Sequence, residues 1–271
     1  MDDGGIYEAP RQVEDVGDCH FYHVMDLPGF GVVGGEWDLR GREHAYLGGE
    51  PLRGRRVLEL GTASGALCRF MDEQGAEVVG FDLSPEHSWD MVPFAKFDVD
   101  ALIASSREHI RRLNNAWWLV HRLFNLRARL VHGTAHHIPA EIGPVDVSTA
   151  CAILLHLRDP FGALANAARL TRETMIVADV HPEQPEGAGL GSAVPRHARS
   201  PIPGAVYLLP NPVCEDPAGA FAWWSLPPEA IGQFLGVLGF EDQSVTDSFQ
   251  IFQGKPTRMY TVVGRRTRPL R

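Results

Sequence analysis

The stretch from residue 55 to residue 82 constrains the fold of this 271-residue chain more than any other. It begins with a short apolar strand pattern, 55–60, and continues into a turn that contains Gly61 and Gly65. Apolar residues at helical spacing follow, and a second strand pattern covers Glu77–Asp82. A strand, a helix and a second strand in this order form a βαβ unit, so the sequence predicts two parallel strands here.

Strands and helices continue to alternate after this unit, which predicts a doubly wound, mostly parallel α/β sheet. After Asp146, the run 145–155 consists of apolar or small residues, as expected for a strand that is buried on both faces. Asp159-Pro160 combines a capping side chain with a proline at the first helical position. Further elements are expected at a helix over 106–125, strands over 128–132 and 175–179, a helix from Pro227-Pro228, and strands over 240–245 and 259–263.

The pattern divides the chain into a lead-in and one large domain. Residues 1–55 are rich in glycine and aromatic side chains, and we expect them to cap the site. Residues 56–271 form the predicted ligand-binding domain. Within it, residues 181–205 are rich in proline and glycine, which predicts a long loop that acts as a lid.

Bulk properties exclude several classes of protein. No apolar run is long enough for a membrane span, and the acidic first residues do not resemble a secretory signal, so we expect a cytoplasmic protein. A formal net charge of -9 disfavours a general polyanion binder. The cysteines form no C-x-x-C pair, which predicts free thiols and no metal site: Cys19, Cys68, Cys151 and Cys214.

The glycine turn and the next strand together predict a nucleoside site. Gly61 and Gly65 allow a ligand to approach the backbone, and Asp82 ends the second strand, 21 positions after Gly61. That spacing suits a carboxylate that accepts hydrogen bonds from ribose hydroxyls. Ala63 stands where a dinucleotide motif requires glycine, which argues against NAD.

The pattern Glu59-x-Gly61-x-x-x-Gly65 resembles that of class I S-adenosylmethionine-dependent methyltransferases. The resemblance implies a seven-stranded, Rossmann-like methyltransferase fold, S-adenosylmethionine as cofactor and S-adenosylhomocysteine as product. Further segments resemble the branch of wobble-uridine tRNA methyltransferases and carboxymethyltransferases: Phe21–Pro28, Gly35–Leu39, Val57–Gly65, Asn114–Trp118, Leu154–Pro160, Trp223-Trp224 and Gly239-Phe240.

This resemblance also assigns residues to the cofactor. Gly61, Thr62 and Gly65 would contact its methionine part, and Asp82 its ribose. The other residues that would bind the cofactor are Glu59 and Ala63 in the turn, Thr134 and Ala135 beside adenine, and Cys151 and Ala152 where the fourth strand ends. Leu155 stands where carboxymethylating members carry tyrosine, which favours ordinary S-adenosylmethionine over its carboxylated relative.

Methyl transfer requires alignment of donor and acceptor, and a base only where the acceptor must lose a proton. His156 is the candidate base, because we expect it at the end of a strand that faces the site. Local packing is the competing interpretation. Aromatic and histidine side chains that would contact the acceptor, or that simply pack, are Tyr22, His23, Trp37, Trp118 and Trp224.

The sequence leaves the acceptor open. Six arginines between residues 107 and 129 favour RNA as a local partner. The negative net charge of the chain argues against RNA, and so does the lack of the long N-terminal extension that is typical of the carboxymethylating members. We therefore expect a small-molecule acceptor. The alternatives are a tRNA wobble-uridine methyltransferase and a non-catalytic S-adenosylmethionine-binding protein, since fold alone does not establish function. A homo-oligomer is also open.

Overall fold

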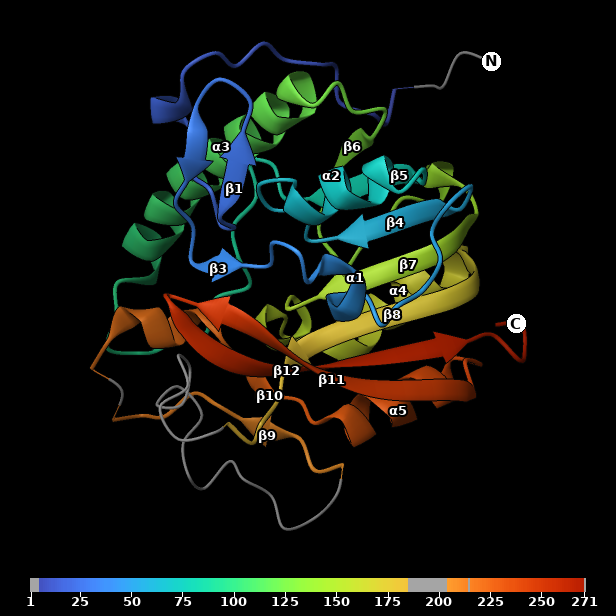
Figure 1. The fold of residues 1–271 in the computed structure, drawn as a ribbon. Coiled ribbons are helices and arrows are strands. Elements are labelled where there is room, and N and C mark those ends of the chain that lie inside the picture. Colours follow the sequence, from blue (N-terminus) through green and yellow to red (C-terminus); the bar gives the residue numbers. More distant parts are fainter. Residues whose placement is uncertain (1–4, 185–203, 214, 271) are drawn as a thin grey trace.

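An eight-stranded sheet forms the centre of the computed structural model, which describes residues 5–184, 204–213 and 215–270 (Figure 1). The strand order is β3-β11-β12-β8-β7-β4-β5-β6. The bounds of these strands are β3 Trp37–Asp38, β4 Arg56–Leu60, β5 Glu77–Asp82, β6 Arg129–His132, β7 Val145–Cys151, β8 Thr171–Val180, β11 Asp242–Phe252 and β12 Lys255–Arg265.

The five strands from β8 to β6 are parallel, with β4 between β7 and β5. Their residues alternate between two apolar cores, one on each face of the sheet. Val57 and Val78 belong to one core, whereas Leu58 and Val79 belong to the other. The order of β4 and its neighbours reverses at this point, which is where doubly wound sheets bind ligands.

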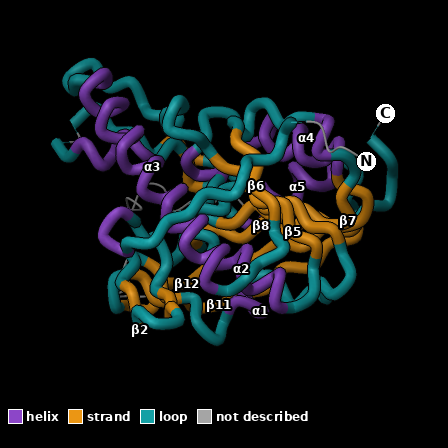
Figure 2. Tube along the Cα trace, turned by 90° about the horizontal axis from the view of Figure 1, so that it is seen from above, coloured by secondary structure: helices purple, strands orange, loops and turns teal. Residues whose placement is uncertain are grey.

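Helices cover both faces of the sheet (Figures 1 and 2). The core that contains Val57 is covered by α1 Glu43–Tyr46, α2 Ala66–Glu73 and α3 Val99–Leu123. The core on the other face is covered by α4 Pro160–Leu170 and α5 Pro228–Val237. The prediction of a Rossmann-like α/β fold is therefore confirmed.

The other half of the sheet is antiparallel. β12 pairs with β8, and β11 pairs with the other side of β12. The two-residue turn Gln253-Gly254 joins β11 to β12. Both turn residues have positive φ, at 48° and 78°, which is the backbone of a type I′ hairpin turn. The smaller elements are η1 Val16–Asp18, η2 Ala140–Ile142, η3 Leu154–His156, η5 Pro217–Phe221, the hairpin of β1 Met25–Leu27 with β2 Gly31–Val33, and the pair β9 Tyr207–Leu208 with β10 Trp224–Ser225.

The described part of the lead-in, residues 5–55, packs against the large domain. It contributes β3, which is the eighth strand of a sheet for which seven strands were expected. β3 pairs with the end of β11, where Trp37 lies opposite Phe252. α1 packs on β12, and the Thr261 hydroxyl donates to the Tyr46 carbonyl at 2.9 Å. The carboxyl end of the sheet is therefore bordered by residues of the lead-in.

Two predicted elements have different bounds. The helix expected over 106–125 begins at Val99, because the Asp98 carboxylate caps it by accepting from the Ala101 N–H at 3.0 Å. The strand expected to reach residue 155 ends at Cys151, since the backbone of Ala152 turns to φ +50°. His156 therefore lies in η3, after the strand rather than at its end.

Most of the lid predicted over 181–205 lies outside the described residues, as does Cys214. Among the helices that the structure describes, none is both long and apolar enough to cross a membrane.

The Asp159 carboxylate caps α4 by accepting from the Gly162 N–H at 2.8 Å. Replacement by alanine leaves this amide without its partner, so we expect Asp159→Ala to lower the free energy of unfolding by about 1 kcal/mol. Asp159→Asn keeps an acceptor and is expected to lose only a small part of this stability. Urea unfolding measures both variants, and an equal loss in the two would contradict the capping role.

Candidate functional site

The turn between β4 and α2 has a backbone that few residues tolerate. Gly61 has φ +74° and Gly65 has φ +82°. A Cβ atom on Gly61 would lie 2.8 Å from the end of the Ile153 side chain, so any other residue there would displace Ile153 as well as adopt a strained backbone. Ala63 also adopts positive φ, +47°, in the position that argued against a dinucleotide motif. The turn therefore brings backbone atoms to the carboxyl end of β4.

A series of buried side-chain hydrogen bonds holds this turn from the interior of the protein. The Thr62 hydroxyl donates to Glu59 at 2.8 Å, and the Trp117 indole N–H donates to Thr62 at 3.1 Å. Glu59 is only 2% exposed, and burial raises the pKa of its carboxyl to about 8. The predicted cofactor residues Glu59 and Thr62 thus lie within one polar cluster under the turn.

Asp82 ends β5 directly beside the turn. One carboxylate oxygen accepts from the Ala63 N–H at 2.6 Å, and the other accepts from the Leu83 N–H at 2.7 Å. Burial raises the pKa of Asp82, and these two backbone N–H groups oppose that rise. Two carboxylate oxygens have about four acceptor positions in total, so the group retains capacity for the hydroxyls of a ligand.

The neighbouring strand ends bring the remaining predicted cofactor residues to the same edge. The Gly133 N–H donates to the Asp82 carbonyl at 2.8 Å, so Thr134 and Ala135 begin the loop beside β5. On the other side, β7 ends at Cys151, and burial raises the pKa of this thiol. All ten predicted cofactor residues therefore lie along the carboxyl ends of β4, β5, β6 and β7.

A cavity of about 230 Å³ opens beyond the ends of β7 and β8. It is mostly apolar, and Ala152 places it next to the predicted cofactor edge. Its polar or ionisable side chains are Tyr22, Glu36, His156, Asp179, Trp224 and Ser225, and its other described lining residues include Trp37, Leu155, Phe221 and Phe252. None of the described lining residues is lysine or arginine.

His156 reaches this cavity from η3. Its Nδ1 is hydrogen-bonded to the Phe221 carbonyl, which can only accept, so Nδ1 carries the hydrogen and Nε2 has the lone pair. Burial lowers the pKa of the ring, which keeps it neutral near pH 7. The imidazole is therefore in a form that can accept a proton.

Asp179 is the residue of this cavity that the sequence interpretation missed. It is the last residue but one of β8, is 3% exposed, and its Oδ1 accepts from the Val180 N–H at 2.7 Å. Its Oδ2 has no hydrogen-bond partner in the described part of the chain. The signal was available, because Asp179 follows the apolar run 175–178 in the same way as Asp82 follows 78–81.

The predicted acceptor residues fall into two groups. Tyr22, Trp37 and Trp224 line the cavity together with His156. His23 lines a different cavity, with Arg40 and Arg69 among its walls, and Trp118 is buried in the core against Trp117. The structure thus brings three of the five to one place.

A methyltransferase-domain family model matches residues 38–199, which is more than half of the chain. The chain belongs to the methyltransferase-domain family. It is an S-adenosylmethionine-dependent methyltransferase, as the glycine turn predicted. No curated protein matches the methyltransferase significantly in sequence.

Solved structures similar to the methyltransferase include magnesium protoporphyrin IX methyltransferase from Synechocystis PCC 6803, with 14% identity over 82% of this chain and 80% of that one, and a TM-score of 0.49. A methyltransferase of Burkholderia thailandensis that acts at N1 of 1,6-didemethyltoxoflavin has 14% identity, coverages of 83% and 75%, and a TM-score of 0.48. A methyltransferase from Aquifex aeolicus has 14% identity, coverages of 84% and 94%, and a TM-score of 0.47.

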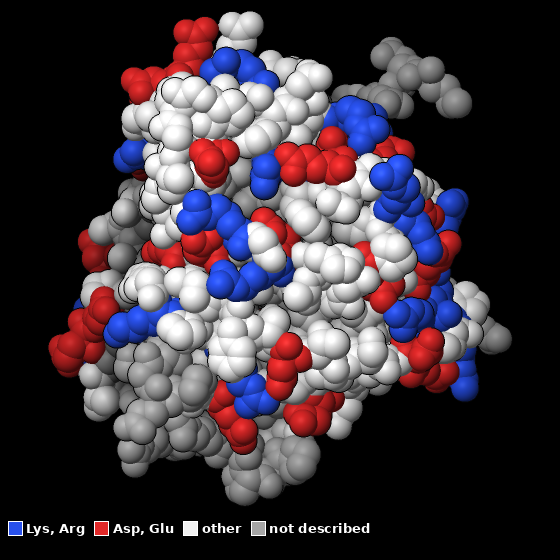
Figure 3. All heavy atoms as spheres, viewed as in Figure 1, with Lys and Arg blue, Asp and Glu red and all other residues white. Residues whose placement is uncertain are grey.

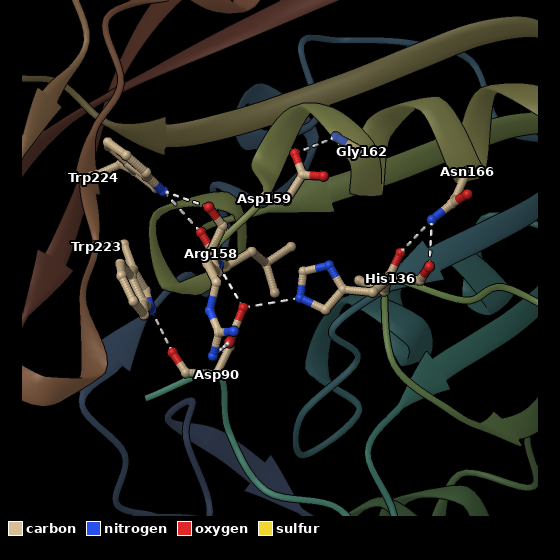
Figure 4. Close-up of polar contacts among 10 residues, drawn as sticks. Asp90, His136, Arg158, Asp159, Gly162, Asn166, Trp223 and Trp224 are labelled. Carbon is tan, nitrogen blue, oxygen red and sulfur yellow. Dashed lines mark hydrogen bonds and ion pairs between the residues drawn. The ribbon is translucent and has the colours of Figure 1, made fainter. Parts of the chain in front are cut away.

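A polar network holds together the loops around the candidate site (Figure 4). The Asp90 carboxylate contacts His136 at 2.9 Å and accepts from the Arg158 N–H at 2.5 Å. The Trp223 indole donates to the Asp90 carbonyl. Asp90 therefore connects the loop after β5 with the loop after β6, the start of α4 and the segment before β10.

Two side chains extend this network towards predicted site residues. The Trp224 indole donates to the Leu157 carbonyl at 2.9 Å. The Asn166 amide donates to the carbonyls of Ala135, at 3.2 Å, and His136, at 2.8 Å. Asn166 thus holds the loop at Ala135 from α4, and Trp224 is held against the segment that precedes α4.

Five of the six arginines that suggested RNA, all but Arg107, have partners within the described part of the protein. Arg112 donates to the carbonyls of Gly17 and Cys19 at 3.0 Å, so it attaches the lead-in to α3. Others form ion pairs, among them Arg111 with Glu108 at 2.6 Å and Arg127 with Asp72 at 3.6 Å. On the face shown in Figure 3, basic and acidic side chains are interspersed. In the described part of the chain, no three His, Cys, Asp or Glu side chains are placed to hold a metal.

The Glu59 carboxyl has a pKa of about 8 in the fold and an ordinary value of 4.5. Between these values the folded state binds a proton that the unfolded state has lost, so this group lowers the free energy of unfolding as the pH rises from about 4.5 to 8. Glu59→Gln removes the titration. We expect its stability relative to the native protein to increase between pH 5 and pH 8 in denaturant unfolding. A constant difference at both pH values would contradict the raised pKa.

Proposed function

We propose that this methyltransferase acts on a small-molecule acceptor, with the cofactor over the glycine turn and the acceptor in the cavity beyond β7 and β8. The observation that carries the proposal is that the predicted cofactor site and the cavity lie next to each other. Ala152 lies at the predicted cofactor edge and also lines the cavity. A cavity of about 230 Å³ is small, since pockets for drug-sized ligands have about 300–1,000 Å³.

The residues of the turn fit the cofactor. The Asp82 carboxylate retains acceptor positions for ribose hydroxyls, and the buried Glu59 carboxyl holds the turn in place by accepting from the Thr62 hydroxyl. We assign the cofactor to Glu59, Gly61, Thr62, Ala63, Gly65 and Asp82 in and beside the turn, and to Thr134, Ala135, Cys151 and Ala152 at the neighbouring strand ends. S-adenosylmethionine supplies a methyl group bonded to a positively charged sulfur.

The other residues act on the acceptor. Tyr22, Trp37 and Trp224 would contact it through their rings, and His156 would accept its proton through Nε2 while the Phe221 carbonyl holds the imidazole in position. We assign residues 1–55 to a cap over the site and 56–271 to cofactor binding. The internal bonds of the arginines support a small molecule over tRNA as acceptor.

The cofactor assignment is tested by calorimetry. We expect the protein to bind S-adenosylmethionine and S-adenosylhomocysteine but not NAD, and we expect Asp82→Ala to raise both Kd values more than tenfold, because it removes charge-assisted hydrogen bonds to ribose. Asp242→Ala is a matched control, since this carboxylate is exposed at the opposite end of the sheet. Binding that survives in Asp82→Ala would overturn the assignment.

The assignment of His156 is tested by turnover of methyl-labelled cofactor with a panel of small acceptors. We expect His156→Ala to lower kcat by about 10²–10⁴-fold, the usual contribution of a general base. His156→Asn keeps an N–H donor for the Phe221 carbonyl but has no basic nitrogen, so it should lose as much. Recovery of turnover in the asparagine variant would indicate a positioning role instead.

A further inference from the structure

We propose that the cavity binds its acceptor as a protonated amine, and that Asp179 is the residue that binds the nitrogen. The inference rests on the proposed function, because it concerns the cavity assigned there to the acceptor. It adds the chemical class of the acceptor and a residue that recognises it.

The first observation is the unused bonding capacity of Asp179. The side chain is almost fully buried, yet its Oδ2 accepts no hydrogen bond within the described part of the chain. A buried carboxylate oxygen without a donor is costly, and buried polar groups in proteins are nearly always paired. Asp179 lines the cavity, so a donor that enters the cavity can supply the missing bond.

The second observation is that no cationic side chain of the described residues lowers the pKa of Asp179. The described groups whose pKa its charge affects are Tyr22 of the lead-in, Tyr46 of α1, Cys151 of β7 and Tyr260 of β12. Burial raises the pKa of all four, so all are neutral near pH 7. The Tyr260 hydroxyl already donates to the Leu226 carbonyl at 2.8 Å. The charge of Asp179 is therefore unbalanced within this part of the fold.

The walls of the cavity suit a cation. Rings of Tyr22, Trp37, Phe221, Trp224 and Phe252 line it, and those of Trp37 and Phe252 pack with centroids 4.7 Å apart. Aromatic faces attract ammonium groups, most strongly where water is excluded. Glu36 adds a second carboxylate from an exposed position, and His156 is neutral. An amine would thus meet negative charge and ring faces, whereas a carboxylate or phosphate would meet repulsion.

Burial raises the pKa of Asp179 to about 7, so the free protein holds this carboxyl partly protonated at neutral pH. An ammonium group beside Oδ2 favours the charged form and would lower that pKa. The bond gained is charge-assisted and is made to a buried side chain, where such bonds are stronger than at the surface. The cost that Asp179 imposes on the free protein is then offset when the acceptor binds.

The inference is tested by calorimetry on the protein saturated with S-adenosylhomocysteine. The probes form two matched sets: tyramine, 4-ethylphenol and 4-hydroxyphenylacetate, and cyclohexylmethylamine, cyclohexylmethanol and cyclohexanecarboxylate. In at least one set, we expect the amine to bind about tenfold or more tightly than the neutral compound, with the carboxylate weakest. If the amine is not preferred in either set, including the case where nothing binds, the inference is overturned.

Asp179→Asn separates recognition from structure. We expect it to raise the Kd of the preferred amine about tenfold and to change that of the matched neutral compound less than twofold, while Asp242→Asn changes neither. An equal loss for both compounds would contradict a role in binding the nitrogen. Failure of the native protein to bind S-adenosylhomocysteine would instead refute the proposed function, so the two failures are distinguishable.

Stability supplies a readout that needs no acceptor. The folded pKa of Asp179 is about 7 and its ordinary value is 3.8, so this group lowers the free energy of unfolding as the pH rises through that interval. Asp179→Asn should therefore gain stability relative to the native protein between pH 5 and pH 8. Loss of stability by the same amount at both values would show that the carboxyl serves the fold and would overturn the inference.

Discussion

The bond between the Ala63 N–H and the Asp82 carboxylate joins two parallel strands at the point where each ends. It holds the turn after β4 against the end of β5. The hydrogen bonds among Glu59, Thr62 and Trp117 hold the same turn from inside the protein. A buried backbone N–H group needs a hydrogen-bond acceptor, and the acceptor for the Ala63 N–H is Asp82. The position of Asp82 therefore fixes the position of the turn. The rest of the carboxyl edge is arranged around this contact.

Much of this arrangement was predictable because it depends on local chemistry. The βαβ unit of 55–82, the cap at Asp159 and the buried strand from Val145 each follow from periodicity or from a capping side chain near in sequence. The short β3 strand could not be predicted, since two residues have no periodicity and Trp37 finds its place only by pairing with Phe252, more than two hundred residues later.

The site shows the same division. The turn residues and Asp82 are recognisable because their spacing is set within one βαβ unit. The cavity is formed by segments distant in sequence, among them the lead-in, η3, the end of β8 and the residues before α5, so no spacing reveals it. Asp179 was recognisable as a polar side chain after an apolar strand, but its place in the cavity was not, and Trp118 was placed at the site although helix α3 turns it into the core.

The central claim is that the glycine turn and Asp82 bind the adenosyl cofactor beside an acceptor cavity. A crystal structure with S-adenosylhomocysteine tests it most directly. The account predicts the ribose hydroxyls on the Asp82 carboxylate and the sulfur directed past Ala152 towards the cavity that His156 and Asp179 line. A ligand bound elsewhere, with Asp82 contacting only the N–H groups of Ala63 and Leu83, would contradict it.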